Sequence, residues 1–191
     1  MNNTEEYCPT NEQEWRKWLD ENHQNKTAVW LVYHKKNSPH YNLNWSQAVD
    51  QALCFGWIDS TSRPIDELRY KQYFSRRKPK SNWSKINKDK IELLIENGLM
   101  REAGLKSIEI AKENGSWTIL DKIEALEVPD DLAKAFSENE GSETFYEGLS
   151  NSIKKQMLYW IDSAKLAETR QKRIKELVAH FSNGQRPKQF R

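Results

Sequence analysis

Hydrophobic residues recur with two different periods along this chain, and the change of period divides it in two. In TAVWLVYHKK (27–36) they fill both alternating sets of positions, which is typical of a strand covered on both faces. The segments 57–66 and 69–76 read as two more strands, with a proline near the end of the first that favours a sheet edge. These segments predict a small antiparallel sheet of about three strands.

Helical spacing fills the rest of the first 115 residues, where apolar residues recur every three to four positions. The four predicted helices start near 11, 45, 85 and 101, with Asn11 or Thr10, Asn44, and Ser84 or Asn82 as candidate caps. Their predicted inner faces include Trp15, Trp18 and Leu19; Trp45, Val49, Ala52 and Leu53; and Ile86, Ile91, Leu94 and Ile95. We therefore expect an α+β fold in which helices cover the sheet.

From Pro129 to about residue 182 the period is helical throughout, with no strand signal. The apolar phase is lost around Glu168–Thr169, which predicts a break there with Thr169 capping a new helix. The sequence therefore predicts an α/β N-terminal domain over 1–118, a helical domain over 125–184, and a basic tail over 185–191 that frays.

Charge is segregated along the chain, although the net charge is only +2. Residues 69–90 carry nine basic and one acidic side chains, and residues 165–191 carry eight and two. The segments 1–68 and 91–164 have net charges of −4 and −8. The local blocks therefore indicate possible partners better than the whole-chain balance does.

The first basic block ends in RKPKSNWS (77–84), the strongest candidate binding site in the sequence. Pro79 restricts the backbone between Lys78 and Lys80, so the two charges stay close. The following hydroxyls and amide precede a helix N-terminus, where unsatisfied N–H groups attract anions. A bound phosphate, sulfate or carboxylate would relieve the repulsion of crowded cations. The alternative is a solvated loop whose cations only keep the protein soluble.

The second basic block contains Arg170 and Arg173, which share a helix face because they are three residues apart. They could form a second anion seat with Thr169. The alternatives are an exposed helix face, or pairing with the acidic segment 121–147.

Candidate catalytic chemistry is sparse. Asp59 follows a helix–strand junction and is flanked by hydroxyl side chains, so it could orient a ligand or act in catalysis; alternatively it bonds local backbone or pairs with Arg63 or the basic loop. The chain has no HExxH, GxGxxG, GxxxxGK[ST] or GxSxG pattern, and Cys8 and Cys54 lack metal-ligand spacing. We therefore expect two reduced thiols, no metal and no cofactor.

Aromatic residues are interleaved with the cations, as in proteins that stack single-stranded nucleic acid. They are Tyr70, Tyr73, Phe74 and Trp83. The alternative is that alternate aromatics on this strand face the core. Acidic segments on both sides also disfavour a large nucleic-acid footprint.

Several stretches resemble one bacterial family. AVDQALCFGWIDS (48–60), RKPKSNWSKIN (77–87) and GLMREAGLKSIEIAKENGSW (98–117) resemble the YdeI/OmpD-associated family, and 128–136 with 145–174 look like its bacteriocin-protection domain. The resemblance implies an N-terminal fold of the YjbR/CyaY-like type and a role in stress or bacteriocin protection, with no catalytic mechanism to carry over.

Together these observations predict a cytoplasmic, non-enzymatic stress or bacteriocin-protection protein with an anion-binding basic loop. No apolar run approaches the roughly 18 residues of a membrane span, and the first residues lack a secretory signal pattern. The expected partner is an anionic small molecule or an acidic protein surface. The predicted binding residues are Trp57, Asp59, Arg77, Lys78, Lys80, Ser81, Trp83, Asn87, Arg170 and Arg173. The alternatives are an enzyme acting on a phosphorylated or carboxylated small molecule with Asp59 in its pocket, and a weak nucleic-acid binder.

Overall fold

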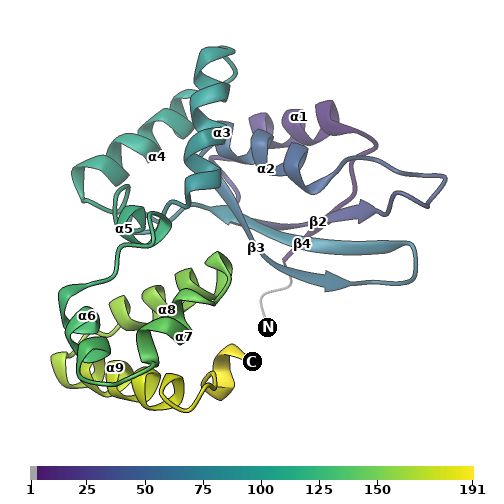
Figure 1. Ribbon diagram of the computed structural model, residues 1–191. Coiled ribbons are helices and arrows are strands. Elements are labelled where there is room, and N and C mark those ends of the chain that lie inside the picture. Colours follow the sequence, from purple (N-terminus) through teal and green to yellow (C-terminus); the bar gives the residue numbers. More distant parts are fainter. Residues whose placement is uncertain (1–3) are drawn as a thin grey trace. The chain divides into compact units, whose positions relative to one another are not determined.

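The computed structural model describes residues 4–191, and the chain divides into two compact units, one ending at Ile119 and the other beginning at Leu120. The first unit contains a four-stranded sheet in the order β1-β2-β4-β3 (Figure 1). The strands are β1 (Glu6–Tyr7), β2 (Ala28–His34), β3 (Trp57–Pro64) and β4 (Arg69–Arg76). β1 pairs with β2 in parallel, and the other pairs are antiparallel.

The three predicted strands are present, but the prediction of a purely antiparallel, three-stranded sheet is wrong. β1 makes the sheet mixed, and its two residues are too short to show any hydrophobic period. β3 lies at the sheet edge, and Pro64 ends it there. An edge strand tolerates this residue because proline donates no hydrogen bond to a neighbouring strand.

The helices of this unit are α1 (Glu12–Asn22), α2 (Trp45–Cys54), α3 (Lys85–Glu96) and α4 (Glu102–Glu113). Asn11, Asn44 and Ser84 cap the first three, and each side-chain oxygen accepts a backbone N–H of the first turn. α1 and α2 lie along one face of the sheet (Figure 1). The α+β architecture of helices on a sheet is therefore confirmed, while the YjbR/CyaY-like assignment stays a prediction.

Tryptophans form the centre of the core between these helices and the sheet. Trp15 and Trp18 of α1 stack at 5.3 Å between ring centroids, and Trp18 meets Trp57 of β3 edge-on at 5.8 Å. The Trp15 Nε1 donates to the Ala48 carbonyl at 3.0 Å, so its one polar atom is satisfied within the core. These contacts fasten α1 to α2 and to the sheet.

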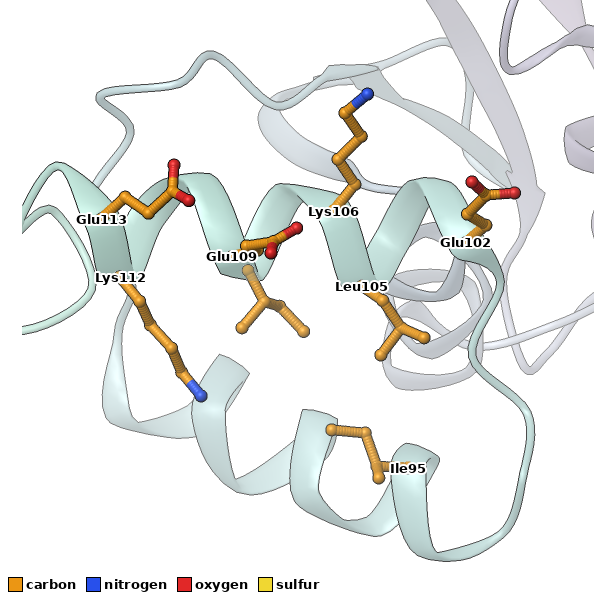
Figure 2. Close-up of a pocket in the computed structure, with 8 residues that line it drawn as sticks. Ile95, Glu102, Leu105, Lys106, Glu109, Lys112 and Glu113 are labelled. Carbon is orange, nitrogen blue, oxygen red and sulfur yellow. The ribbon is translucent and has the colours of Figure 1, made fainter.

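α4 packs closely on the end of α2 and directs its opposite face outward. A side chain at Gly104 would bring a Cβ to 2.4 Å from the Cys54 carbonyl oxygen, so only glycine permits this approach. Three residues predicted to be inner are exposed instead: Trp45, Ile86 and Ile95. Ile95 lines a groove between α3 and α4 (Figure 2). The helical period predicted these faces, but Ile95 borders the solvent-open groove, and the Trp45 indole donates to Asp59 of β3 at 2.9 Å instead of entering the core.

The second unit is entirely helical. Its helices are α5 (Asp121–Glu124), α6 (Asp130–Ser137), α7 (Ser142–Glu147), α8 (Asn151–Asp162) and α9 (Ala167–Phe181), followed by the short turn η1 (Lys188–Phe190). Their core includes Leu132, Phe136, Met157, Ile161 and Phe181.

Two details of this unit differ from the prediction. α9 follows Leu166, so Thr169 lies inside the helix rather than capping it. The chain after residue 184 ends in η1, whose Phe190 meets the Trp160 ring at 5.5 Å. An aromatic residue that packs in this way anchors a tail whose charge alone would favour fraying.

Candidate functional site

Arg77 is the central residue of the candidate site, and β4 delivers it there. Its backbone N–H donates to the Gly56 carbonyl at 2.9 Å, just past the last residue of β4. Its guanidinium carbon lies 3.5 Å from the centroid of the Trp83 ring, a close cation–π contact. Trp83 is almost fully buried and supports the guanidinium from below its plane.

Two of the three guanidinium nitrogens of Arg77 have no hydrogen-bond partner within residues 4–191. Nη1 donates to the Asn82 carbonyl at 2.9 Å, whereas Nε and Nη2 are buried without a hydrogen bond among the described residues. Burial lowers the pKa of Arg77 to about 10, although the charge of Asp59 acts in the opposite direction. Buried polar groups are nearly always satisfied, so an unpaired guanidinium edge requires an explanation.

The loop after Arg77 is held by the end of α4. The Pro79 carbonyl accepts from the Asn114 side chain at 2.8 Å and from the Ser116 hydroxyl at 3.2 Å. Trp117 lies against Trp83 with 5.0 Å between ring centroids. The basic loop is therefore braced on a second element rather than free in solvent.

Sequence reasoning missed this brace, because Asn114, Ser116 and Trp117 lie about thirty positions beyond the loop. The available signal was the Gly115 that ends α4, followed directly by a polar and an aromatic residue.

The remaining loop residues surround Arg77 with charge and donors. Lys78 and Lys80 are exposed, and within residues 4–191 neither forms an ion pair. The Ser81 N–H donates to the Lys78 carbonyl at 2.9 Å, which closes a turn. The Asn87 N–H is taken by the Ser84 cap at 3.3 Å, so Asn87 contributes to the start of α3.

Asp59 and Trp57 lie on β3, and both make contacts of their own. One Asp59 oxygen, Oδ2, accepts from the Trp45 indole at 2.9 Å and from the Gln72 amide at 2.6 Å. Asp59 thus links α2, β3 and β4, and its charge still acts on Arg77. Trp57 is fully buried beside Trp18, so its ring has no free face for a ligand.

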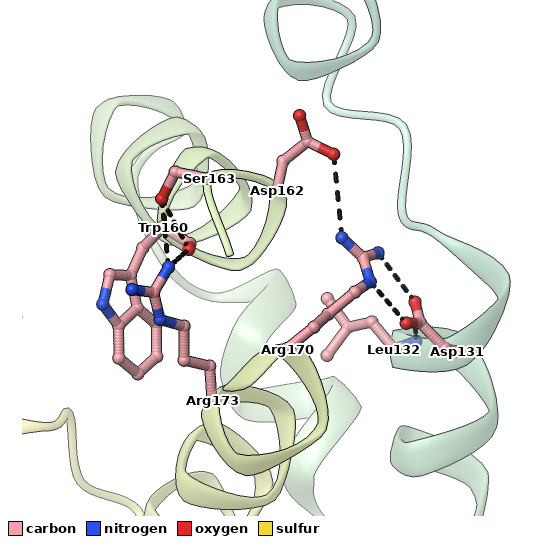
Figure 3. A network of polar contacts seen from close by, with 7 residues as sticks. All are labelled: Asp131, Leu132, Trp160, Asp162, Ser163, Arg170 and Arg173. Atoms are coloured by element: carbon pink, nitrogen blue, oxygen red, sulfur yellow. Dashed lines mark hydrogen bonds and ion pairs between the residues drawn. The ribbon is translucent and has the colours of Figure 1, made fainter. Parts of the chain in front are cut away.

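Arg170 belongs to the second unit and is paired within it (Figure 3). Its Nε and Nη2 donate to the two oxygens of Asp131 at 2.6 and 3.0 Å, and its Nη1 lies 3.6 Å from Asp162. The hydrogen bond to Arg170 lowers the pKa of Asp131, and the same bond raises the pKa of Arg170. This bidentate pair joins α9 to the first turn of α6 and to the end of α8.

Arg173 is also engaged in the second unit. Its Nη1 donates to the Trp160 carbonyl and, at 3.0 Å, to the Ser163 hydroxyl (Figure 3). Its guanidinium carbon lies 5.1 Å from the Trp160 ring centroid. Arg170 thus takes the predicted alternative role of pairing with the acidic segment 121–147, whereas Arg173 instead holds the end of α8 through Trp160 and Ser163.

Metal-ligand clusters, membrane-spanning helices and the state of the cysteines can each be stated for the described part of the chain. Residues 4–191 contain no cluster of three or more His, Cys, Asp or Glu side chains suited to a metal ion. Among the same residues, no helix has the length and apolar character needed to span a bilayer. Cys8 and Cys54 are free thiols.

Comparison with known families matches both units of this two-part α+β chain. A family model described as "Domain of unknown function (DUF8412)" matches residues 7–107, more than half of the chain, and the chain belongs to that family. A model described as "Bacteriocin-protection, YdeI or OmpD-Associated" matches residues 125–184, so the chain carries that domain. The resemblance to the bacteriocin-protection domain is therefore confirmed for residues 125–184, whereas the motifs at 48–60 and 77–87 lie in the domain of unknown function. No curated protein and no solved structure matches the chain.

Proposed function

We propose that this protein is a non-enzymatic binding protein of the bacteriocin-protection type, and that its N-terminal unit holds an anionic group at Arg77. The observation that carries the proposal is the buried, unpartnered Nε–Nη2 edge of this guanidinium. An arginine edge of this kind offers two parallel N–H donors that match a carboxylate or phosphate. The expected ligand therefore presents a carboxylate or a phosphoryl group.

Arg170 of the same chain supports this reading of Arg77. There the same two nitrogens, Nε and Nη2, hold both oxygens of Asp131. At Arg77 the corresponding donors have no carboxylate from residues 4–191, and Trp83 with the Asn82 carbonyl fixes the plane of the group. A fixed fork loses little entropy when it binds, which favours affinity.

The neighbouring side chains divide into distinct roles in this proposal. Lys78 and Lys80 attract the anion and contact its outer oxygens, while Ser81 supplies a hydroxyl. The negative charge of Asp59 partly balances the positive charges of Arg77, Lys78 and Lys80. Its carboxylate also accepts a hydrogen bond from a donor group of the ligand and so orients the ligand. Because both fork nitrogens lie beneath the surface, the ligand reaches them through a local opening, while Trp83 and the Asn82 carbonyl keep the guanidinium in place.

Nucleic acid is a poorer candidate ligand, because the aromatic residues that could stack a base are already engaged. The aromatic pair on the other face of the sheet is Trp30 with Tyr73, edge-on at 5.1 Å. The charged ends of Arg63 and Lys71 each lie 5.1 Å from the Trp30 centroid, so this ring already serves the chain's own cations. Stacking of a base would have to displace them.

The proposal is tested by measuring thermal stability and calorimetric binding with inorganic phosphate and with citrate, at constant ionic strength in chloride. A ligand that binds only the folded state stabilises it by about 2.7 kcal/mol at a hundredfold excess over Kd. We expect both anions to stabilise the wild type. Arg77→Lys keeps the charge but removes the fork, and should weaken binding about tenfold or more.

Arg63→Lys provides the matched control, because it makes the same chemical change on an exposed residue of β3. It should leave anion binding unchanged. Equal loss in both variants would show that general positive charge, rather than the Arg77 fork, holds the anion, and would overturn the proposal. Absence of binding in the wild type would overturn it as well.

A further inference from the structure

Two histidines lie close together at the end of β2, in a pocket whose lining residues are all different from those of the Arg77 site. His34 is the last residue of β2, and His40 belongs to the loop that follows it. Their ring centroids are 5.8 Å apart, and both residues line a pocket of about 510 Å³. The turn between β3 and β4 contributes the opposite part of the lining. Two imidazoles that share one pocket are candidates for a shared ligand.

The hydroxyl of Ser38 contacts both histidines. It lies 3.3 Å from Nδ1 of His34 and accepts the backbone N–H of His40 at 3.2 Å. A serine hydroxyl can accept two hydrogen bonds, because its oxygen has two lone pairs. When Nδ1 of His34 carries the proton and donates to Ser38, Nε2 keeps the free lone pair that a metal ligand needs. Ser38 is only 6% exposed, so a buried side chain sets this arrangement.

Backbone hydrogen bonds hold the segment that joins the two histidines. The backbone N–H of His34 donates to the Asn42 side chain at 2.9 Å. The Lys35 N–H donates to the Leu68 carbonyl at 2.8 Å, and the Ser38 N–H donates to the Lys35 carbonyl at 2.8 Å. The segment is therefore attached to the β3–β4 turn and closed on itself. Ligands that are arranged in advance lose little entropy when they bind an ion.

The charges that line the pocket favour a cation over an anion. Arg69 is already paired, because its Nε and Nη2 both lie 2.8 Å from Oδ2 of Asp66. Glu67 also lines the pocket, and its carboxylate forms no ion pair within residues 4–191. The ammonium of Lys35, which is not among the lining residues, donates to the Glu67 carbonyl at 2.9 Å. The unpaired charge of the lining is therefore negative.

The distance between the two rings suits a metal ion that both imidazoles bind. Imidazole is a preferred ligand of Zn²⁺, Ni²⁺ and Cu²⁺, whereas Mg²⁺ and Ca²⁺ prefer oxygen ligands. With Zn–N distances of about 2.0–2.1 Å, two imidazoles on one tetrahedral ion have ring centroids roughly 5 Å apart. His34 and His40 are at 5.8 Å, so a small side-chain movement of the exposed His40 is sufficient.

We propose that His34 and His40 form a binding site for a divalent late transition-metal ion, of which Zn²⁺ and Ni²⁺ are the probes. His34 binds through Nε2, and Ser38 orients its ring from the outer shell. Residues 4–191 contain no group of three or more side chains suited to a metal ion, so water completes the coordination.

The absence of a metal-binding pattern in the sequence does not exclude this pair. Patterns such as HExxH place two histidines on one face of a helix, whereas His34 and His40 join a strand end to a loop six residues further on. The bound ion would fasten that loop to the end of β2. The proposal is independent of the anion site at Arg77.

Isothermal titration calorimetry of the full chain with Zn²⁺ and with Ni²⁺, in a buffer that does not chelate metals, tests the proposal. The wild type should bind one ion with micromolar affinity and should not bind Mg²⁺. His34→Gln and His40→Gln should each weaken binding at least about tenfold, because either change removes one of only two protein ligands. His40 is exposed, so its replacement should leave the fold intact, which circular dichroism verifies.

His180→Gln is the matched control, because it makes the same change at a histidine of the second unit whose Nδ1 donates to the Glu176 carbonyl at 2.8 Å. Cys8→Ser controls for the exposed thiol. Both controls should bind the ion as the wild type does. A wild type that binds neither ion would overturn the proposal. So would binding that His34→Gln and His40→Gln leave unchanged, or a loss in either control as large as in these two variants.

Discussion

Arg77 in the first unit and Arg170 in the second are the same side chain in opposite situations. At Arg170, Nε and Nη2 both bind Asp131, and the pKa of the guanidinium is raised by that hydrogen bond. At Arg77 the same two nitrogens are buried without a hydrogen-bond partner in the described part of the chain, and burial lowers the pKa to about 10. Arg170 is completed by residues of its own chain, whereas Arg77 is left incomplete.

This difference separates a structural role from a binding role. A buried charge is stable only when a counter-charge or hydrogen bonds compensate its lost hydration. Asp131 and Asp162 supply that compensation at Arg170, whereas Trp83 and one carbonyl supply only part of it at Arg77. A ligand with a carboxylate or phosphate supplies the two hydrogen bonds that the fold leaves unmade at Arg77, and this contributes to its binding free energy.

The largest change in stability is expected when the Trp83 ring, which packs against the Arg77 guanidinium, is removed. Trp83→Ala should lower the free energy of unfolding by roughly 3–5 kcal/mol, because a buried ring is lost and a cavity remains. Urea unfolding followed by circular dichroism measures the change. Ile86→Ala, at a position that is 60% exposed on α3, should cost far less. If the two variants proved equally mild, Trp83 would not be a core residue.

Replacing each arginine by methionine sharpens the comparison directly. Arg170→Met leaves Asp131 without its bidentate partner and should destabilise the protein by about 1–3 kcal/mol. Arg77→Met removes a charge that is not compensated and keeps a side chain over Trp83, so stability should change by less than about 1 kcal/mol.

Urea unfolding of both variants beside the wild type tests this pair of predictions. A loss of more than 2 kcal/mol at Arg77 would mean that its charge supports the fold. The distinction between the two arginines would then disappear.

Low pH should weaken the ion pair between Arg170 and Asp131 by protonating Asp131. The pKa of Asp131 is lowered in the folded protein, first by its hydrogen bond to Arg170. The stability it contributes is therefore complete above the ordinary aspartate pKa, about 3.9, and is lost as the pH falls through the lowered folded-state value. Unfolding midpoints measured between neutral pH and acid should show this loss in the wild type. Asp131→Asn should lose less stability over the same range.

The smallest effect is expected at the two exposed lysines. The double variant Lys78→Ala/Lys80→Ala should keep its stability within roughly 0.5 kcal/mol, since neither side chain forms an ion pair in residues 4–191. Its affinity for phosphate should nevertheless fall, and more strongly at low salt. Calorimetry at two ionic strengths measures both. Unchanged affinity at low salt would remove the lysines from the site.

Local chemistry explains what the sequence predicted well. The sequence predicts Asn44 as a cap and narrows the other two caps to Asn11 or Thr10 and Ser84 or Asn82, because the capping hydrogen bond involves only neighbouring residues; Asn11, Asn44 and Ser84 are the caps observed. The hairpin of β3 and β4 followed from alternation and a turn for the same reason. The sequence did not predict β1, because two residues show no hydrophobic alternation and their pairing with β2 depends on tertiary packing.

The sequence predicted several residues of the candidate site, but not how they are arranged in space. The sequence placed Arg77, Arg170 and Trp57 together in one binding set, since all lie near cations or in family motifs. Burial of Trp57 in the core and pairing of Arg170 with Asp131 depend on contacts between distant segments. The free edge of Arg77 depends equally on Trp83 and Gly56, which no local pattern reveals.

The most direct test of the central claim follows the arginine Nε–Hε resonances of nitrogen-15-labelled protein by NMR during a titration with inorganic phosphate. We predict that the Arg77 resonance shifts and reaches saturation, because a fork-bound anion accepts from Nε, while the Arg170 resonance stays in place against Asp131. An Arg77 resonance that does not move, or equal and non-saturating shifts at all arginines, would contradict the claim that Arg77 awaits an anion.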